Sequence, residues 1–285
     1  MTVETVDLQS KVNPEVGALP TAFPAFLSTN IIDLFLLKGK AAVVTGGIRG
    51  IGFAVCEAYC QAQLDQLAII DYSPYDENLR QLQSRYPKTD IRFYTVDVTK
   101  AAQVQRAIEE IVLEFGKIDI FVANAGIAWT SGALIDQDSD DEWLRVMDVD
   151  VNGVYYCAKH VGRQFRKQGF GSLVMTASMS SHIVNVPNFQ ACYNAAKAAV
   201  RHLGKSLAVE WAAFARVNSI SPGYINTELS DFVPEDIKST WYQLTAKGRQ
   251  GTPKELVGAY LYLASDAANF TTGTDIIVDG GYCST

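Results

Sequence analysis

Short apolar runs alternate with longer segments of helical periodicity from residue 40 to the end of the chain. Several of the short runs are apolar almost without interruption, which is typical of parallel strands covered on both faces. We expect strands at residues 41–45, 67–71, 91–96, 118–123, 172–176, 217–220 and 275–278. We expect helices near residues 50–63, 76–86, 100–116, 141–168, 190–214 and 253–265. Strands that alternate with helices are joined by right-handed crossovers, so the pattern predicts an α/β fold with a doubly wound parallel sheet of the Rossmann type.

Two segments fall outside this alternation. Residues 1–38 contain three prolines and are interpreted as an N-terminal arm, which leaves residues 39–285 as a single domain. Residues 224–250 form a long connection after a strand, and loops of that length in compact domains are usually functional. We interpret residues 224–250 as a substrate lid.

The composition limits the classes of partner. The chain has 285 residues and a formal net charge of −7, whereas a nucleic-acid partner would require clustered Lys and Arg. No apolar run reaches the ~20 residues that span a bilayer, and the N-terminus lacks the pattern of a secretory signal. Five scattered cysteines indicate neither a disulfide framework nor a metal site. We therefore expect a cytoplasmic protein with no metal, no nucleic-acid partner and no membrane partner.

A glycine-rich turn follows the first expected strand and reads T-G-G-I-R-G-I-G over residues 45–52. Glycines leave room for a pyrophosphate to reach the N-terminus of the following helix, whose free N–H groups bind it. Glycine-rich turns are common, but this one opens the first βαβ unit, which is where a dinucleotide site belongs. The cofactor contacts expected here are Gly46, Ile48, Arg49, Gly50, Ile51 and Gly52.

The end of the second expected strand bears on the choice between NAD(H) and NADP(H). Asp71 lies nineteen residues after Gly52, where a carboxylate accepts both ribose hydroxyls of adenosine and repels a 2′-phosphate. Aspartate is also an ordinary residue at the end of a strand. Arg49 could pair with a 2′-phosphate or with Asp71. The residues alone therefore indicate NAD(P)(H), with NAD(H) slightly favoured by Asp71.

Tyr193 and Lys197 lie four residues apart in an expected helix and so share one face. An ammonium near a phenol favours the phenolate, so we expect Lys197 to lower the pKa of Tyr193 toward the working pH. Ser178 follows a strand at the carboxyl edge of the sheet, where α/β proteins bind ligands. The Tyr-x-x-x-Lys spacing is frequent by chance, and only its combination with Ser178 and the glycine turn indicates a catalytic site.

With these motifs the chain resembles the short-chain dehydrogenase/reductase family over roughly residues 38–283. Three further motifs of that family are present at residues 96–98 (Val-Asp-Val), 124–126 (Asn-Ala-Gly) and 222–223 (Pro-Gly). The resemblance implies that Ser178, Tyr193 and Lys197 are catalytic. It implies further cofactor contacts at Asp97, Val98, Asn124, Ala125, Gly126, Tyr193, Lys197, Pro222, Gly223, Ile225 and Thr227.

Within the family, the chain is most similar to fungal carbonyl, sorbose and mannitol-type reductases, through segments such as residues 33–35 and 279–282. This similarity favours NADP(H), in contrast to the indication from Asp71. The resemblance to the family as a whole implies a homotetramer or dimer that pairs through helices and the last strand. The apolar helix 253–265 with its Tyr260 and Tyr262 would suit that interface, and residues 1–38 would contribute contacts.

Two positions depart from the family pattern. The family usually has asparagine in an Asn-x-x-Gly motif that serves the proton relay, whereas this chain has Asp150 there, with Asn152 two residues later. Asp150 is accordingly expected in the catalytic set, with its role in the relay open. Ser178 lies fifteen residues before Tyr193, a longer gap than is usual, so Ser180 and Ser181 are alternatives to it.

The implied reaction is hydride transfer between a nicotinamide and a ketone or secondary alcohol, such as a ketose and its polyol or a secondary-metabolite carbonyl. Tyr193 would exchange the proton, Lys197 would hold the nicotinamide ribose, and Ser178 would bind the reacting oxygen. The small-molecule substrate is encoded less clearly, and each aromatic residue in its pocket could equally belong to the core. The expected pocket residues are Trp129, Ser178, Met179, Asn188, Tyr224 and Trp241.

Two other functions remain open on the same fold. One is a non-redox cyclase or lyase that keeps the pocket without hydride transfer, and the other is a cofactor-binding scaffold without chemistry. The Ser178, Tyr193 and Lys197 set argues against both, whereas Asp150 leaves the first open.

Overall fold

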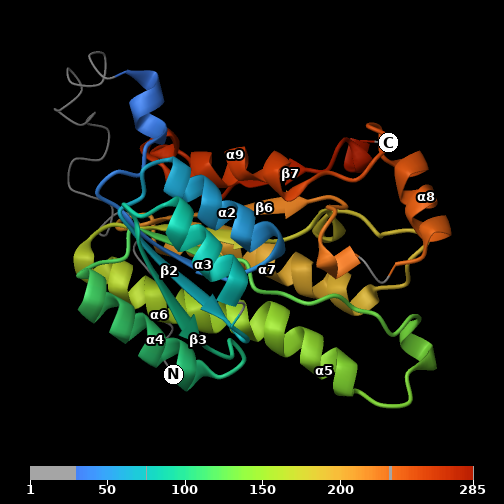
Figure 1. Cartoon of the computed structure of the whole chain (residues 1–285). Helices are drawn as coiled ribbons and strands as arrows, with labels where there is room; N and C mark the ends of the chain where they lie inside the picture. The colour runs from blue at the N-terminus through green and yellow to red at the C-terminus, as the bar shows by residue number, and fades with distance from the viewer. Residues whose placement is uncertain (1–29, 75, 231–232, 285) are drawn as a thin grey trace.

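A seven-stranded sheet, parallel throughout, forms the centre of the computed structural model, which describes residues 30–74, 76–230 and 233–284 (Figure 1). The spatial order of the strands is β3-β2-β1-β4-β5-β6-β7. The order reverses between β1 and β4, and α/β sheets bind ligands at such a switch point, outside the carboxyl ends of the strands. The strands are β1 (Ala41–Thr45), β2 (Gln66–Asp71), β3 (Asp90–Thr95), β4 (Ile120–Ala123), β5 (Ser172–Thr176), β6 (Arg216–Pro222) and β7 (Asp275–Val278).

The sequence prediction of the sheet is confirmed, and all seven expected strands are present. β1, β4 and β5 are buried at every position, because helices cover both faces of the sheet. The largest difference is at β6, which runs two residues further than expected, to Pro222, and pairs with β7 there.

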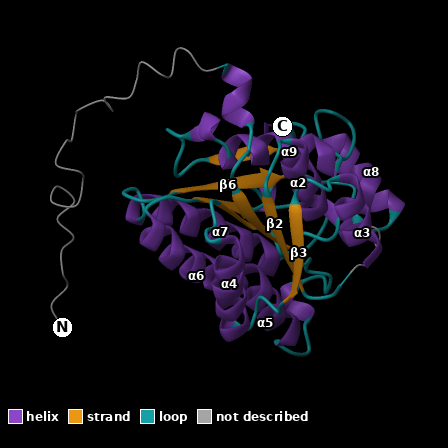
Figure 2. Ribbon diagram, turned by 60° about the vertical axis from the view of Figure 1, so that its left-hand side comes forward, coloured by secondary structure: helices purple, strands orange, loops and turns teal. Residues whose placement is uncertain are grey.

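Helices lie on both faces of the sheet (Figures 1 and 2). One core joins the sheet to α2 (Gly50–Gln61), α3 (Asp76–Arg85) and α9 (Pro253–Ala264). The other core joins it to α4 (Ala101–Phe115), α6 (Gly153–Gln168) and α7 (Ala191–Glu210). A capping box of Thr252 and Glu255 begins α9. Tyr260 of α9 is fully buried within the chain, so our expectation that it is available for an interface between subunits is wrong.

The expected continuous helix over residues 141–168 is interrupted. α5 (Asp141–Met147) passes through a π-helical turn, Asp148–Asn152, before α6 begins at Gly153. Such turns insert an extra residue into a helix and occur frequently at functional sites. The helical periodicity of so short a segment does not reveal one inserted residue.

The connection over residues 224–250 contains regular structure that the sequence pattern did not predict. A short 3₁₀ turn, Glu228–Ser230, precedes α8 (Glu235–Leu244). α8 buries Trp241 toward the domain. The expected N-terminal arm lies mostly outside the described residues; its described end forms a 3₁₀ turn over Ile31–Phe35.

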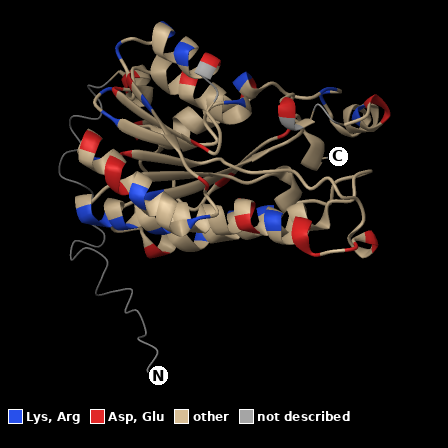
Figure 3. Cartoon of the chain, turned by 60° about the horizontal axis from the view of Figure 1, so that its bottom comes forward, with Lys and Arg blue, Asp and Glu red and all other residues tan. Residues whose placement is uncertain are grey.

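The remaining described elements are short 3₁₀ turns in the loops. They are Leu134–Asp136, Met179–Ser181, Asp266–Ala268 and Tyr282–Ser284. Lys and Arg are interspersed with Asp and Glu along the helices in the view of Figure 3. Within the described ranges, no helix is both long and apolar enough to cross a membrane.

Candidate active site

A cavity of about 970 Å³ opens at the carboxyl ends of the central strands. Residues after β1, β4, β5 and β6 all contribute to its lining, as the topology of the sheet requires. The structure brings almost the whole predicted site together around this one cavity. The predicted residues that line it are Gly46, Arg49, Gly50, Ile51, Asp71, Asp97, Val98, Asn124, Ala125, Gly126, Trp129, Asp150, Ser178, Met179, Asn188, Tyr193, Lys197, Pro222, Gly223, Tyr224, Ile225, Thr227 and Trp241.

Ile48 and Gly52 are the two predicted contacts outside that lining. Ile48 is buried in the core between the sheet and α2. Gly52 allows α2 to approach the turn closely, since a Cβ built at Gly52 would lie 2.0 Å from the carbonyl oxygen of Gly46. Gly46 itself has φ +63°, a conformation that favours glycine. Both glycines therefore shape the turn, and only Gly46 faces the cavity.

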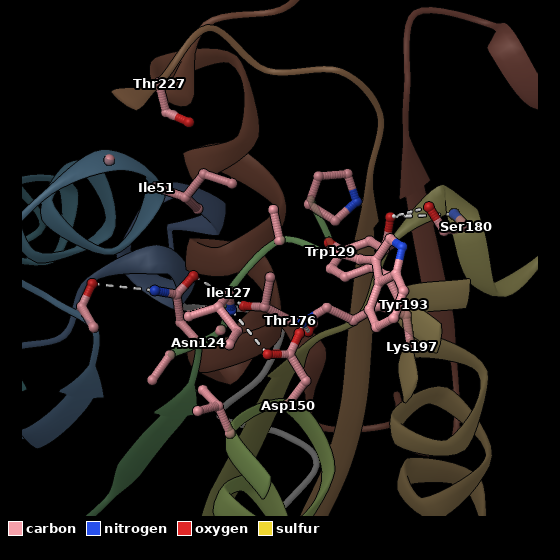
Figure 4. A pocket seen from close by; sticks show the side chains of 18 of the residues that line it. Ile51, Asn124, Ile127, Trp129, Asp150, Thr176, Ser180, Tyr193, Lys197 and Thr227 are labelled. Atoms are coloured by element: carbon pink, nitrogen blue, oxygen red, sulfur yellow. Dashed lines mark hydrogen bonds and ion pairs between the residues drawn. The ribbon is translucent and has the colours of Figure 1, made fainter. Parts of the chain in front are cut away.

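Asn124 fixes the glycine turn to the middle of the sheet. Its Nδ2 donates to the carbonyl oxygens of Thr45 and Gly46, at 3.1 and 3.2 Å. Its Oδ1 accepts a hydrogen bond of 3.1 Å from the hydroxyl of Thr176 at the end of β5. The Asn124 side chain therefore connects the glycine turn to Thr176 through hydrogen bonds (Figure 4).

Asp71 and Arg49 both line the cavity near the glycine turn, but no ion pair joins them among the described residues. The Asp71 carboxylate accepts backbone N–H groups from Tyr72 at 2.8 Å and from Ile48 at 3.5 Å. Arg49 is exposed and occupies the N-cap position of α2, where its side chain makes no capping hydrogen bond. Of the two pairings open to Arg49, the one with Asp71 is not formed.

Asp97 occupies the turn after β3. Its carboxylate accepts hydrogen bonds from the backbone N–H and the hydroxyl of Thr99, at 2.9 and 2.7 Å. These bonds fix the conformation of the turn, and Asp97 and Val98 both line the cavity.

Ser178 and Ser180 both line the cavity, and Ser181 does not. Ser178 begins the 3₁₀ turn after β5, where its Oγ accepts the N–H of Ser180 at 3.1 Å and donates to the Ser180 hydroxyl at 3.0 Å. A hydrogen bond with Ser178 also lowers the pKa of Tyr193. Of the three serines, Ser178 is therefore the one that interacts with the tyrosine.

Burial raises the pKa of Tyr193 above its ordinary value, and this is the largest influence on the phenol. Lys197 lowers the pKa of Tyr193, as expected, with its Nζ 5.4 Å from the centre of the ring. The carboxylate of Asp150 raises it again. The expected net lowering is thus wrong for this arrangement, because desolvation of the phenolate and the charge of Asp150 together outweigh the lysine.

Asp150 is fully buried in the π-helical turn and forms an ion pair with Lys197, with 2.9 Å between Oδ2 and Nζ. Its Oδ1 accepts the N–H of Ile127 at 2.8 Å. Gly126 lies against the pair, since a Cβ there would be 3.1 Å from Nζ and 3.2 Å from Oδ2. The Asp150 charge raises the pKa of Lys197 against the opposing effect of burial. Figure 4 shows Asp150, Lys197 and Tyr193 next to one another.

Aromatic and amide side chains form the part of the cavity that continues from Ser178 toward α8. Tyr224 stacks on Trp241, with ring centroids 3.8 Å apart and an angle of 6° between the planes. Trp241 Nε1 donates to Asn188 Oδ1 at 2.8 Å. Trp129 is largely buried and packs in a small core that includes Tyr193. Each of these expected pocket residues therefore lines the cavity and also packs against neighbours.

Several polar residues line the cavity that the sequence pattern did not single out. Asn185 and Gln190 lie with Asn188 in the loop between β5 and α7, and Thr176 ends β5. The concentration of amide side chains shortly after Ser178 was the available signal for the first two. Arg145 and Gln250 also line the cavity, but they come from segments without a recognisable motif.

Comparison with known proteins agrees with this geometry. The family model described as Enoyl-(Acyl carrier protein) reductase matches residues 46–283. The chain therefore belongs to the short-chain dehydrogenase/reductase family of NAD(P)(H)-dependent oxidoreductases.

Individual relatives are similar over nearly their whole length. A probable NADP-dependent mannitol dehydrogenase from Yarrowia lipolytica is 56% identical over 265 residues, covering 93% of this chain and 95% of the relative. A sorbose reductase from Candida albicans is 53% identical over 277 residues, covering 97% and 98%. The crystal structure of an NADPH-dependent 3-quinuclidinone reductase from Rhodotorula rubra superposes with a TM-score of 0.88 at 39% identity, covering 96% of this chain and 100% of that one.

Proposed function

We propose that this protein interconverts a ketose and its polyol, with NADP(H) as the preferred cofactor. One observation carries the proposal: Ser178, Tyr193 and the Asp150–Lys197 pair lie around the same cavity as the glycine turn. The relatives named for mannitol and sorbose support the polyol and ketose class.

The glycine turn fits a dinucleotide. The absence of a side chain at Gly52 lets α2 begin close to the turn, since a Cβ there would overlap the carbonyl oxygen of Gly46. The N–H groups of the first turn of α2 would bind the pyrophosphate. Residues near Gly126 and Lys197 would hold the nicotinamide end, and Thr227 would contact the carboxamide. When bound, the nicotinamide supplies or accepts the hydride.

In the reductive direction, Tyr193 would donate its phenolic proton to the carbonyl oxygen of the substrate. Ser178 would hydrogen-bond the same oxygen and stabilise the negative charge that develops on it. Lys197 would hold the nicotinamide ribose, and its ammonium would stabilise the phenolate that remains on Tyr193. In the oxidative direction, the Tyr193 phenolate would accept the hydroxyl proton.

Asp150 would act as a positioning residue through Lys197. Its carboxylate fixes the ammonium at 2.9 Å and also raises the pKa of Tyr193. A protonated Tyr193 is the form that carbonyl reduction requires. Asp150 thus holds Lys197 in place and opposes the effect of Lys197 on the pKa of the phenol.

The preference for NADP(H) rests on the relatives and on Arg49. A relative 56% identical to this chain is named NADP-dependent, and the exposed Arg49 is available to a 2′-phosphate beside the turn. Asp71 opposes this, because a carboxylate repels a phosphate. Both carboxylate oxygens of Asp71 already accept backbone N–H groups, as in an ordinary turn. We therefore give the relatives more weight than Asp71, and this revises the slight preference for NAD(H) drawn from the sequence.

Three further features complete the proposal. Residues 224–250 would act as a substrate lid, because Trp241 and Tyr224 in that segment line the cavity. The protein would assemble as a homotetramer or dimer through α9 and the edge strand β7, where Ile277 is 41% exposed. It would function in the cytoplasm, in keeping with five free cysteines, four of them buried.

Absorbance of the reduced nicotinamide distinguishes this function from the two alternatives. NADPH would be mixed with fructose, sorbose and simple ketones, and the reverse reaction would be followed with mannitol and NADP⁺. Turnover of a ketose supports the proposal. Nucleotide binding without turnover of any carbonyl or polyol would instead indicate a non-redox enzyme or a scaffold.

A further inference from the structure

The loop between β5 and α7 places a buried amide at the cavity. Asn185 is 2% exposed, lines the cavity and lies seven residues after Ser178. Its Nδ2 donates to the Tyr224 hydroxyl at 3.2 Å. Within the described residues, no group donates to its Oδ1, which is fully buried.

A buried carbonyl oxygen is normally paired with a donor, and an unpaired one in a folded protein calls for a ligand or an ordered water. The hydroxyl oxygen of Tyr224 accepts a hydrogen bond from Asn185 Nδ2, and the indole N–H of Trp241 donates to Asn188. Asn185 lines the cavity, so a ligand bound there is the available source of the donor that Oδ1 lacks among the described residues.

The position of Asn185 is held by a chain of contacts. Tyr224 accepts a hydrogen bond from Asn185 Nδ2 and is stacked on Trp241. Trp241 in turn donates a hydrogen bond to Asn188. These contacts connect the loop after β5 to β6 and to α8. A rigidly held acceptor discriminates between ligands better than a mobile one, because little rotamer entropy is lost on binding.

We propose that Asn185 Oδ1 accepts a hydrogen bond from a substrate hydroxyl other than the one that reacts, and so selects polyhydroxylated ketones. Ser178 and Tyr193 already supply the hydrogen-bond and proton donors for the reacting oxygen. A second hydroxyl on a neighbouring carbon supplies the donor that Asn185 lacks, whereas a simple ketone leaves the acceptor buried and unpaired. This inference rests on the proposed ketose reductase function and names the residue that would recognise the substrate class.

The test is a double-mutant cycle between protein and substrate. The parent is fructose or sorbose, whichever the wild type reduces faster, and its derivatives each lack one hydroxyl. We expect one derivative to be reduced by the wild type with a kcat/KM about tenfold or more below that of the parent. In Asn185→Leu the same two substrates should differ by less than about twofold. Each ratio is measured on one enzyme preparation, so a smaller folded fraction does not alter it.

Asn188→Leu is the matched control, since its amide oxygen is already bound to Trp241. This variant should lower activity on parent and derivative alike and keep the wild-type ratio. Asn185→Ser is carried through the same series as a second, smaller variant and should lose discrimination as Asn185→Leu does.

The outcomes separate this inference from the proposed function. If the wild type reduces the ketose and the Asn185 variants keep every wild-type ratio, the role of Asn185 is overturned and the proposed function stands. If the wild type reduces simple ketones but no ketose, the proposed function fails, and the inference fails with it.

Discussion

Asp150 and Lys197 form a buried ion pair, with 2.9 Å between Oδ2 and Nζ, one helical turn from Tyr193. The pair exists because a π-helical turn directs Asp150 into the site, and because Gly126 leaves room beside it. Breaking a buried ion pair by removing one partner leaves an uncompensated charge, which is strongly destabilising. The Asp150 carboxylate therefore holds the ammonium of Lys197 and also raises the pKa of Tyr193.

Asp150→Asn should move the pH dependence of both reaction directions to lower pH. Asp150 raises the pKa of Tyr193, so removing its charge lowers that pKa. Oxidation needs the phenolate and should then begin at lower pH, whereas reduction needs the phenol and should decline at lower pH. Profiles of kcat/KM against pH for polyol oxidation and ketose reduction measure both limbs.

The substitution leaves the other groups that act on Tyr193 chemically unchanged. Lys197 and Ser178 lower the pKa of Tyr193, and Tyr224 and Tyr260 interact with it electrostatically. Profiles that coincide with those of the wild type would show that Asp150 acts only as a structural residue.

Ser178→Ala should reduce the rate of the chemical step by about ten- to a thousand-fold, the range for one lost oxyanion donor. Ser180→Ala should have a much smaller effect, because Ser180 contacts Ser178 rather than the phenol. Single-turnover rates with saturating cofactor measure this step. Activity that survives in Ser178→Ala and is lost in Ser180→Ala would reverse the assignment.

Gly52→Ala should weaken nucleotide binding, because the added Cβ would overlap the Gly46 carbonyl oxygen. Overpacking of this kind costs about 1–3 kcal/mol. Gly258→Ala in α9 is the control, since nothing lies within 4 Å of the added atom and alanine should gain up to about 1 kcal/mol of stability there. Titration with NADPH and thermal unfolding are the measurements. Equal affinity in both variants would mean that the turn does not bind the cofactor.

Asp71→Ser should shift cofactor selectivity toward NADPH. A carboxylate close to a 2′-phosphate costs up to several kcal/mol, so the ratio of kcat/KM for NADPH over NADH should rise at least about tenfold. Arg49→Ala should lower kcat/KM for NADPH and leave NADH nearly unaffected. A selectivity ratio that Asp71→Ser does not alter would place Asp71 away from the adenosine ribose.

Much of the site could be predicted because it depends on local spacing. The glycine turn follows a buried strand, and Tyr193 and Lys197 share a helical face, so their positions follow from secondary structure alone. The contact between Asp150 and Lys197 could not be predicted, since it depends on a π turn that leaves no periodic signature. The same is true of the stack between Tyr224 and Trp241, which requires α8 to fold back onto the end of β6.

The pKa of Tyr193 shows a further limit. The sequence indicated the direction of the lysine effect, but not the burial of the phenol or the carboxylate beside the lysine. Both are tertiary properties, and together they reverse the net direction.

The central claim is that Tyr193 exchanges the proton while a ketose is reduced. The most direct measurement is the initial rate of NADPH oxidation with fructose and with sorbose, for the wild type and for Tyr193→Phe. We expect the wild type to turn over at least one ketose, and Tyr193→Phe to bind NADPH with unchanged affinity while losing turnover by about a hundredfold or more. A Tyr193→Phe enzyme that keeps most of the wild-type rate, or a wild type that reduces neither ketose, would contradict the claim.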